Sequence, residues 1–95
     1  PQEIEKVLNQ HSAVAKAVVI PVNDEIWGKK GIAFVKVTEG ASESELREFL
    51  KDKLAKFKHP KEFVFLEEFP ITGFGKISRK DLTRIFHQKK KKNES

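Results

Sequence analysis

The segment Phe63 to Leu66 constrains the fold of this chain more than any other part of the sequence. It consists of four consecutive apolar residues, Phe-Val-Phe-Leu, which is the length of a short strand. Side chains alternate between the two faces of a strand, so an unbroken apolar run predicts a strand buried on both faces. A sheet with such a strand needs apolar cover on both sides. Helices packed against the sheet are the natural cover in a chain of 95 residues.

The segments before this strand alternate between helical and strand-like patterns. Residues 2–10 have apolar residues at helical spacing, and residues 14–22 are a valine-rich run that is typical of a strand. Residues 23–30 are expected to form a polar loop, and residues 32–38 a second strand.

Two serine-based capping boxes predict the starts of two further helices. Ser42 with Glu45 has the spacing of a capping box, and the helix that it opens is expected to reach about residue 56. Ser78 with Asp81 is a weaker capping box for the last helix. The predicted order is α-β-β-α-β-α. The predicted fold class is α+β, with a small three-stranded sheet covered by about three helices.

The composition excludes several kinds of site. The chain has no cysteine, which excludes disulfides, a thiolate nucleophile and cysteine-based zinc sites. Its three histidines, His11, His59 and His87, lie too far apart in the sequence to form a local metal motif, so we expect no metal site. No apolar run approaches the roughly 20 residues of a membrane span. No signal peptide is visible either, and cytoplasm is the expected location.

The net charge of +5 lies mostly at the C-terminal end. Residues 89–95 contain four lysines and one glutamate, so the rest of the chain is nearly balanced. We therefore expect one domain over residues 1–88, a basic disordered tail over residues 89–95, and no binding of nucleic acid. A stand-alone basic binding module is the alternative, and salt-dependent binding that is lost with the tail would reveal it.

A lysine behind two glycines is the strongest candidate for chemistry. The segment Pro70 to Lys80 places Gly73 and Gly75 before Lys76, with a predicted helix after it. Glycines let the backbone bend and remove side chains that would block a ligand, and lysine presents a compact positive charge. Such a charge suits a reaction in which two anions must meet. A solvated lysine on a surface turn is the alternative, because short motifs often match by chance.

Four segments have the order and spacing of one known family. They are Pro1–Glu5, Asn23–Gly28, Phe57–Lys61 and Phe69–Ile77. With them the chain resembles the C-terminal subdomain of the adenylate-forming superfamily, which includes acyl-CoA synthetases, nonribosomal-peptide adenylation domains and firefly-type luciferases. The first segment reads as a helix start without its capping residue, in a chain without methionine. We therefore expect a piece of a larger protein, most like an acyl-CoA synthetase.

The resemblance implies a two-step ligase reaction. A carboxylate, such as that of a fatty acid, attacks the α-phosphate of ATP and releases pyrophosphate. The thiol of coenzyme A (CoA) then displaces AMP from the acyl-adenylate. Lys76 matches the family's catalytic lysine, and Thr72, Gly73 and Gly75 belong to the same substrate loop. The family places its ATP, acyl and Mg²⁺ sites on a large N-terminal domain, which would be the partner of this one. The isolated chain is therefore expected to be inactive.

The resemblance also implies a surface for CoA, formed by Trp27, Gly28, Phe57, Lys58 and His59. His59 departs from relatives that have arginine there, and neutral imidazole is a poor counter-ion for phosphate, so Lys58 is expected to supply the charge instead. Structural alternatives stay open for the other three. Trp27 could cover the sheet edge, Gly28 could serve a turn, and Phe57 could belong to the core beside the preceding helix.

Two further hypotheses concern the whole domain. One is a nonribosomal-peptide-type adenylation subdomain, whose thiol acceptor is a carrier protein rather than CoA. The other is a purely structural lid, in which case replacement of Lys76 would leave adenylation intact.

Overall fold

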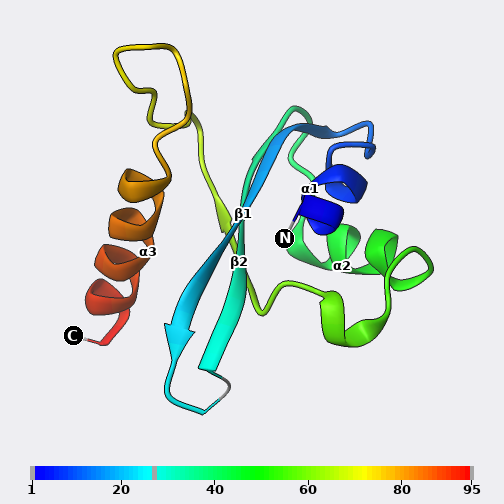
Figure 1. The fold of residues 1–95 in the computed structure, drawn as a ribbon. Helices are drawn as coiled ribbons and strands as arrows, with labels where there is room; N and C mark the ends of the chain where they lie inside the picture. Colours follow the sequence, from blue (N-terminus) through cyan, green and yellow to red (C-terminus); the bar gives the residue numbers. More distant parts are fainter. Residues whose placement is uncertain (1, 27, 95) are drawn as a thin grey trace.

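The computed structural model describes residues 2–26 and 28–94, which form a small sheet with helices on both of its faces (Figure 1). The elements in chain order are α1 (Gln2–Leu8), β1 (Val14–Asp24), β2 (Gly28–Val37), α2 (Glu43–Lys51), the 3₁₀ helix η1 (Lys56–Lys58), β3 (Glu62–Phe65) and α3 (Arg79–Glu94). This arrangement confirms the predicted α-β-β-α-β-α order and the α+β class.

The sheet has the strand order β1-β2-β3, with β2 in the middle. β1 pairs with β2 in antiparallel fashion, with Val19 opposite Ala33. β2 pairs with β3 in parallel fashion, with Phe34 opposite Val64. An antiparallel pair can be joined by a short hairpin, whereas a parallel pair needs a crossover, and α2 lies in that crossover.

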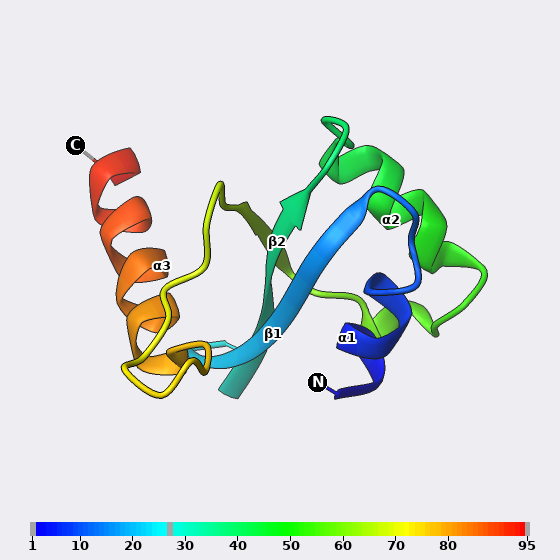
Figure 2. The same ribbon diagram turned by 90° about the horizontal axis from the view of Figure 1, so that it is seen from above.

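Alternation along the strands divides the apolar side chains between two cores, one on each face of the sheet (Figure 2). The core under α1 and α2 comprises Leu8, Val14, Ala17, Val19, Ala33, Val35, Leu46, Leu50 and Leu54. The core under α3 comprises Val18, Ile20, Val22, Ile32, Phe34, Val64, Leu82 and Phe86. Burial of one large apolar side chain contributes about 1.5–3 kcal/mol, so each layer of helices adds substantially to stability.

β3 touches both cores, as its apolar run predicts. Phe63 and Phe65 pack against the core under α1 and α2, whereas Val64 and Leu66 contact the core under α3. Val64 is buried, but both phenylalanines are only partly buried, because β3 lies at an edge of the sheet.

Side chains cover the outer edge of β1. The Asn9 amide group donates to the carbonyl of Ala17 at 3.1 Å, and its Oδ1 accepts from the Ala17 amide at 2.9 Å. Two residues further on, the amide of Val19 donates to the Glu5 carboxylate at 2.9 Å. Pro21 comes next and has no N–H to pair. An uncovered edge can pair with another chain, and these contacts block that pairing.

The structure corrects the prediction of a polar loop over residues 23–30. β1 continues to Asp24 and β2 begins at Gly28, so most of this segment belongs to a hairpin. Asn23 pairs with Lys29 in the strand register, and both residues are exposed. The polar composition therefore reflects exposure of the hairpin end rather than absence of a strand.

α2 begins as predicted but ends earlier. The hydroxyl oxygen of Ser42 accepts from the Glu45 amide at 3.2 Å, which confirms the N-cap. The helix ends at Lys51 rather than near residue 56, and Leu54 then packs into the core. The chain has to leave the helix there to reach the start of β3 beside β2.

α3 continues to Glu94, so the lysine-rich segment is helical as far as that residue. The division into a domain over residues 1–88 and a basic tail over residues 89–95 stays a prediction. Lysine is a good helix former, and positive charge is favourable near a helix C-terminus. Lys90 Nζ also lies 3.7 Å from the carboxylate of Glu62 and 5.6 Å from the centre of the Phe86 ring.

Within the described part of the chain, no helix combines the length and the apolar character that crossing a membrane requires.

Candidate functional site

Lys76 lies in a small hairpin-like loop between β3 and α3. Ile71 and Ile77 form an antiparallel bridge, and the amide of Thr72 donates to the carbonyl of Lys76 at 2.7 Å. The loop therefore satisfies part of its own backbone hydrogen bonding. This internal bonding gives Lys76 a defined backbone position.

Thr72 organises the tip of this loop. Its hydroxyl oxygen accepts from the amides of Phe74 and Lys76, each at 3.3 Å, and its carbonyl accepts from the amide of Gly75 at 3.0 Å. Gly75 has a φ of +80°, which residues with a Cβ rarely adopt. Gly73 is not among the glycines with positive φ. Of the two glycines, only Gly75 is required by the backbone geometry.

The side chain of Lys76 is exposed on this loop, which projects beyond the sheet and is yellow in Figure 1. Among the described residues, its ammonium group has no hydrogen-bond or ion-pair partner. Phe74, at the tip, is 95% exposed. The loop thus presents a positive charge and an aromatic ring that the rest of the described chain leaves available.

Three other sequence-predicted residues, Phe57, Lys58 and His59, lie on the opposite side of the sheet. Phe57 and Lys58 belong to η1, and His59 follows it. η1 lies on the side of α1 and α2, whereas the Lys76 loop lies on the side of α3 (Figures 1 and 2). Phe57 is 82% exposed, so the alternative that placed it in the core is wrong. Its ring is accessible to a flat ligand.

Phe57, Lys58 and His59 line one shallow pocket together with Lys29 from the start of β2. The pocket combines an exposed ring with lysine side chains, which is suitable for an anionic ligand that has an aromatic part. Gly28 precedes Lys29 and has a φ of +80°, so its role in the turn is supported by the backbone. We call this pocket the η1 pocket.

Trp27 lies outside the described residues, and both interpretations of it therefore remain predictions.

Lys58 and His59, two of the polar side chains that line the η1 pocket, have different partners. His59 Nε2 lies 3.0 Å from the carbonyl oxygen of Leu54. A carbonyl can only accept, so Nε2 carries the proton in this contact and the ring is used for structure. Lys58 Nζ pairs with the Glu3 carboxylate at 3.0 Å, and both side chains are partly exposed. Exposed ion pairs are weak, so Lys58 can turn to a phosphate more readily than His59.

Sequence reasoning missed Arg47, which contacts the segment after η1 from α2. Its guanidinium donates to the carbonyls of Pro60 and Lys61, both at 3.1 Å, and pairs with Glu43 at 2.8 Å. It also lies 4.8 Å from the centre of the Phe63 ring. A guanidinium suits such a clamp because its donors have a fixed planar geometry. The spacing of Glu43 and Arg47 shows an ordinary helical ion pair, and only the fold reveals the backbone contacts.

Lys30 lies beside the η1 pocket and links β2 to its neighbours. Its side chain is 11% exposed, and Nζ lies 2.8 Å from Glu62 Oε2 and 3.6 Å from Asp24 Oδ2. The hydrogen bond to Glu62 raises the pKa of Lys30 above its ordinary value of 10.5, although partial burial acts in the opposite direction. Lys30 is therefore charged at neutral pH and contributes a fixed positive charge.

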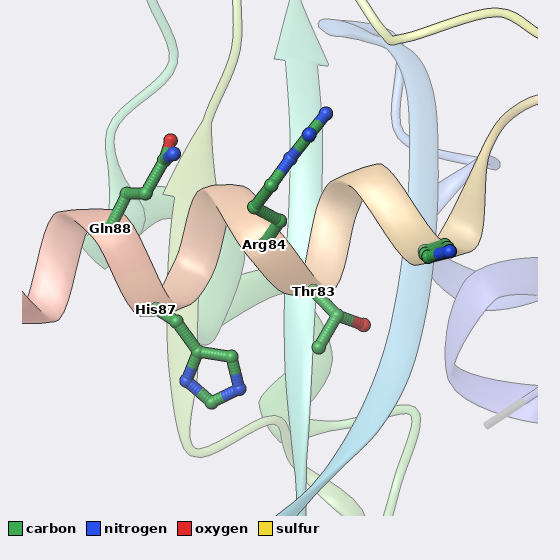
Figure 3. A pocket seen from close by; sticks show the side chains of 5 residues that line it. Thr83, Arg84, His87 and Gln88 are labelled. Atoms are coloured by element: carbon green, nitrogen blue, oxygen red, sulfur yellow. The ribbon is translucent and has the colours of Figure 1, made fainter.

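A shallow hollow on the outer face of α3 has no comparable organisation. Figure 3 shows Thr83 and His87 pointing to one side of the helix and Arg84 and Gln88 to the other. Arg84 is already paired with Asp81 at 2.6 Å. Among the described residues, no group of three His, Asp or Glu side chains is placed to hold a metal ion.

Known proteins share both the sequence and the fold. Residues 3–76 match the family described as AMP-binding enzyme C-terminal domain. The chain is 40% identical over 88 residues to a 2-succinylbenzoate–CoA ligase of Bacillus cereus, which covers 93% of this chain but 18% of that protein. The chain therefore spans about a fifth of the length of such relatives.

Two solved structures have the same fold. A fatty acyl CoA synthetase of Mycobacterium tuberculosis superimposes with a TM-score of 0.79 at 35% identity, over 86% of this chain and 16% of that one. An o-succinylbenzoate CoA synthetase of Bacillus subtilis, in complex with its acyl-adenylate intermediate, superimposes with a TM-score of 0.78 at 38% identity, over 86% of this chain and 17% of that one.

Proposed function

Because this chain belongs to the AMP-binding enzyme C-terminal domain family, we propose that it serves as the small domain of an AMP-forming acid–CoA ligase. In this proposal it contributes two surfaces to one enzyme. The Lys76 loop acts in formation of the acyl-adenylate, and the η1 pocket receives CoA. The remaining parts of the active site belong to a large adenylation domain, as in the relatives that this chain resembles.

The observation that carries the proposal is the state of Lys76. Its backbone is fixed by the hydrogen bonds of Thr72, while its ammonium group is exposed and has no partner among the described residues. An unpaired charge on an internally bonded loop is suited to a ligand that arrives from outside the domain.

The chemistry of adenylation explains why a lysine is useful there. The attacking carboxylate and the triphosphate are both anionic, and charge on the phosphoryl oxygens has to be stabilised in the transition state. An ammonium group aimed at those oxygens lowers the barrier through electrostatic stabilisation, and loss of one such group typically costs roughly 10²–10³-fold in rate. No base is needed, because the carboxylate is already ionised at pH 7.

The η1 pocket is proposed for the second step. Phe57 would stack on the adenine of CoA, Lys58 would face a phosphate, and Arg47 would hold the segment after η1 in place. The pocket and the Lys76 loop lie on opposite sides of the sheet. A change in the orientation of this domain between the two steps fits this geometry.

The acid remains the broadest part of the proposal. By their names, the relatives act on an aryl acid and on fatty acids. The fatty acid that we expected is therefore one of two substrate classes, and a profile of acids with the full-length protein would distinguish them. ATP and CoA are proposed as the other substrates, Mg²⁺ is assigned to the large domain, and cytoplasm stays the expected location.

The decisive experiment replaces Lys76 by alanine in the full-length protein and assays the two half-reactions separately. We expect carboxylate-dependent ATP–pyrophosphate exchange to fall by roughly 10²–10³-fold, while transfer from supplied acyl-adenylate to CoA continues. Lys80→Ala is the control, because Lys80 is a neighbouring exposed lysine. Unchanged exchange in Lys76→Ala would support the structural-lid hypothesis instead. The 95-residue chain alone should catalyse neither step, and turnover by it would contradict the proposal.

A further inference from the structure

Three parts of the chain meet at the backbone of Val19, on the outer edge of β1. The amide of Val19 donates to Glu5 Oε2 from α1 at 2.9 Å. Its carbonyl accepts from the guanidinium of Arg79, the first residue of α3, at 3.5 Å. The same Glu5 oxygen lies 3.7 Å from the other terminal nitrogen of Arg79. The backbone N–H and C=O of Val19, which belong to two adjacent peptide groups, thus face two opposite charges that also attract each other.

Burial distinguishes the Glu5 end of this group from the ordinary surface ion pairs. The Glu5 side chain is 19% exposed, whereas the Arg79 side chain is 59% exposed and the two members of the Lys36–Glu68 pair are 37% and 82% exposed. A hydrogen bond to an ionised group is stronger than one between neutral groups, and partial burial reduces its screening by water. The Glu5 contact is therefore able to hold α1, the edge of β1 and the start of α3 together.

The start of α3 is also the base of the Lys76 loop. Ser78, which precedes Arg79, donates its amide to the carbonyl of Pro70 at 2.9 Å and closes the loop. Its hydroxyl accepts from the amide of Asp81 at 3.2 Å and caps the helix. Arg79 thus lies directly after the residue that closes the loop and three residues after Lys76. A displacement of Arg79 would move the base of the loop.

We infer that Glu5 and Arg79 are positioning residues for Lys76, acting through the backbone N–H and C=O of Val19. This inference rests on the proposed role of Lys76 and adds to it a dependence on the first helix of the domain. Neither residue has to touch a substrate. Their effect is on the direction from which the lysine reaches the phosphoryl group, and a misplacement of about 1 Å in an active site can cost up to about 100-fold in rate.

The first test removes charge with little change of shape. In Glu5→Gln the side-chain oxygen can still accept from the Val19 amide, but the attraction to Arg79 is lost. We expect Glu5→Gln and Arg79→Gln each to lower the maximal rate of ATP–pyrophosphate exchange by about 10-fold in the full-length protein, with little change in the KM for ATP. Arg79→Lys should recover part of the rate. CoA transfer from supplied acyl-adenylate should stay within about twofold of wild type.

Double variants test two points. The first is whether Glu5 and Arg79 affect the rate through the same interaction, and the second is whether that interaction acts by positioning Lys76. Glu5→Gln combined with Arg79→Gln should lose little more than either single change, because both remove the same interaction. In a Lys76→Ala background, Glu5→Gln should cause no further loss of exchange. Arg84→Gln is the matched control, since it removes an exposed ion pair from the same helix without touching Val19.

A second readout does not depend on activity. Hydrogen exchange of the Ser78 amide can be followed by nuclear magnetic resonance in the 95-residue chain. Glu5→Gln and Arg79→Gln should each speed this exchange by about 10-fold, and Arg84→Gln should not, because only the first two loosen the base of the loop.

These measurements separate the inference from the function on which it rests. If Lys76→Ala leaves ATP–pyrophosphate exchange intact, the proposed function is overturned. If Lys76→Ala abolishes exchange while Glu5→Gln and Arg79→Gln behave as wild type, only the positioning role is overturned. Unchanged protection of Ser78 in both charge-removing variants would also overturn the positioning role.

Discussion

Lys30 Nζ donates to Glu62 Oε2 at 2.8 Å and so links β2 to β3 by side chains as well as by backbone. The contact lies at the start of the parallel pair, where the register places Glu62 beside Ile32. Asp24 adds a second carboxylate at 3.6 Å. With its side chain 11% exposed, Lys30 is shielded from water better than the surface lysines of this chain.

The raised pKa of Lys30 predicts a loss of stability at high pH. The hydrogen bond to Glu62 favours the charged form in the folded state, so its contribution to the free energy of unfolding is fully present below the ordinary value of 10.5. The contribution is lost as the pH rises through the raised pKa. Urea unfolding of wild type and Lys30→Gln should therefore differ at about pH 9 and converge towards about pH 12.

Lys36→Gln is the control for this prediction, because Lys36 forms an ion pair with Glu68 whose side chains are far more exposed. Its difference from wild type should be small at every pH. A constant difference between wild type and Lys30→Gln across the alkaline range would contradict the assignment.

The backbone of the Lys76 loop predicts different costs for its two glycines. Gly75→Ala should destabilise the loop by about 1–2 kcal/mol, because alanine is strained at a φ of +80° although a Cβ would meet nothing within 4 Å. Gly73→Ala should leave thermal stability almost unchanged, because the space there is also open and its φ is not positive. Thermal unfolding of both variants checks this, and equal losses would show that the loop has a different backbone in solution.

The exposure of Phe57 predicts that its loss affects binding rather than folding. Phe57→Ala should change the free energy of unfolding by less than about 0.5 kcal/mol. In the full-length protein it should raise the KM for CoA by about tenfold, because stacking on a base is worth about 1–3 kcal/mol. Phe34→Ala provides the contrast, since Phe34 is completely buried and its loss should cost about 3–5 kcal/mol. A strong loss of stability in Phe57→Ala would contradict the assignment of this residue to the CoA surface, because it would show that the ring is needed for folding.

The contacts of Arg47 with two backbone carbonyls predict a loss of stability on substitution that lysine does not restore. Arg47→Ala should destabilise the fold by about 1.5–3 kcal/mol, because the carbonyls of Pro60 and Lys61 lose a charged donor. Arg47→Lys should recover little of this, since one ammonium group cannot reproduce the planar geometry. Denaturant unfolding measures both variants, and full recovery by lysine would mean that charge alone matters at this position.

The sequence patterns predicted the buried elements of the fold better than its exposed hairpin end. The apolar run Phe63–Leu66 indicated a strand with contacts on both faces, and the spacing of Ser42 and Glu45 indicated a helix start; both are confirmed. These predictions succeed because buried strands and helix N-caps require particular residue types at neighbouring positions in the sequence. The hairpin at residues 23–30 could not be recognised in this way, because its strand ends are exposed and polar and their residue types are those of a loop.

The candidate site shows the same limit. Lys76 was identified from its neighbours in the sequence, and its exposed position on an internally bonded loop fits that prediction. Arg47 and Arg79 were missed as structural residues because their partners are backbone groups far away in the sequence. The exposure of Phe57 was open in the sequence, since its spacing continues the apolar face of α2, and it was decided by the early end of that helix at Lys51.

The contact between Asn9 and Ala17 has a consequence for self-association. One carboxamide offers an N–H and a C=O much as a peptide group does, so Asn9 occupies the place that a fourth strand would take. Without Asn9 and the Glu5 carboxylate of α1, the valine-rich β1 would present an open edge, of the kind that pairs with other chains and starts cross-β growth. The first helix and the residue that follows it therefore also shield this edge from other copies of the chain.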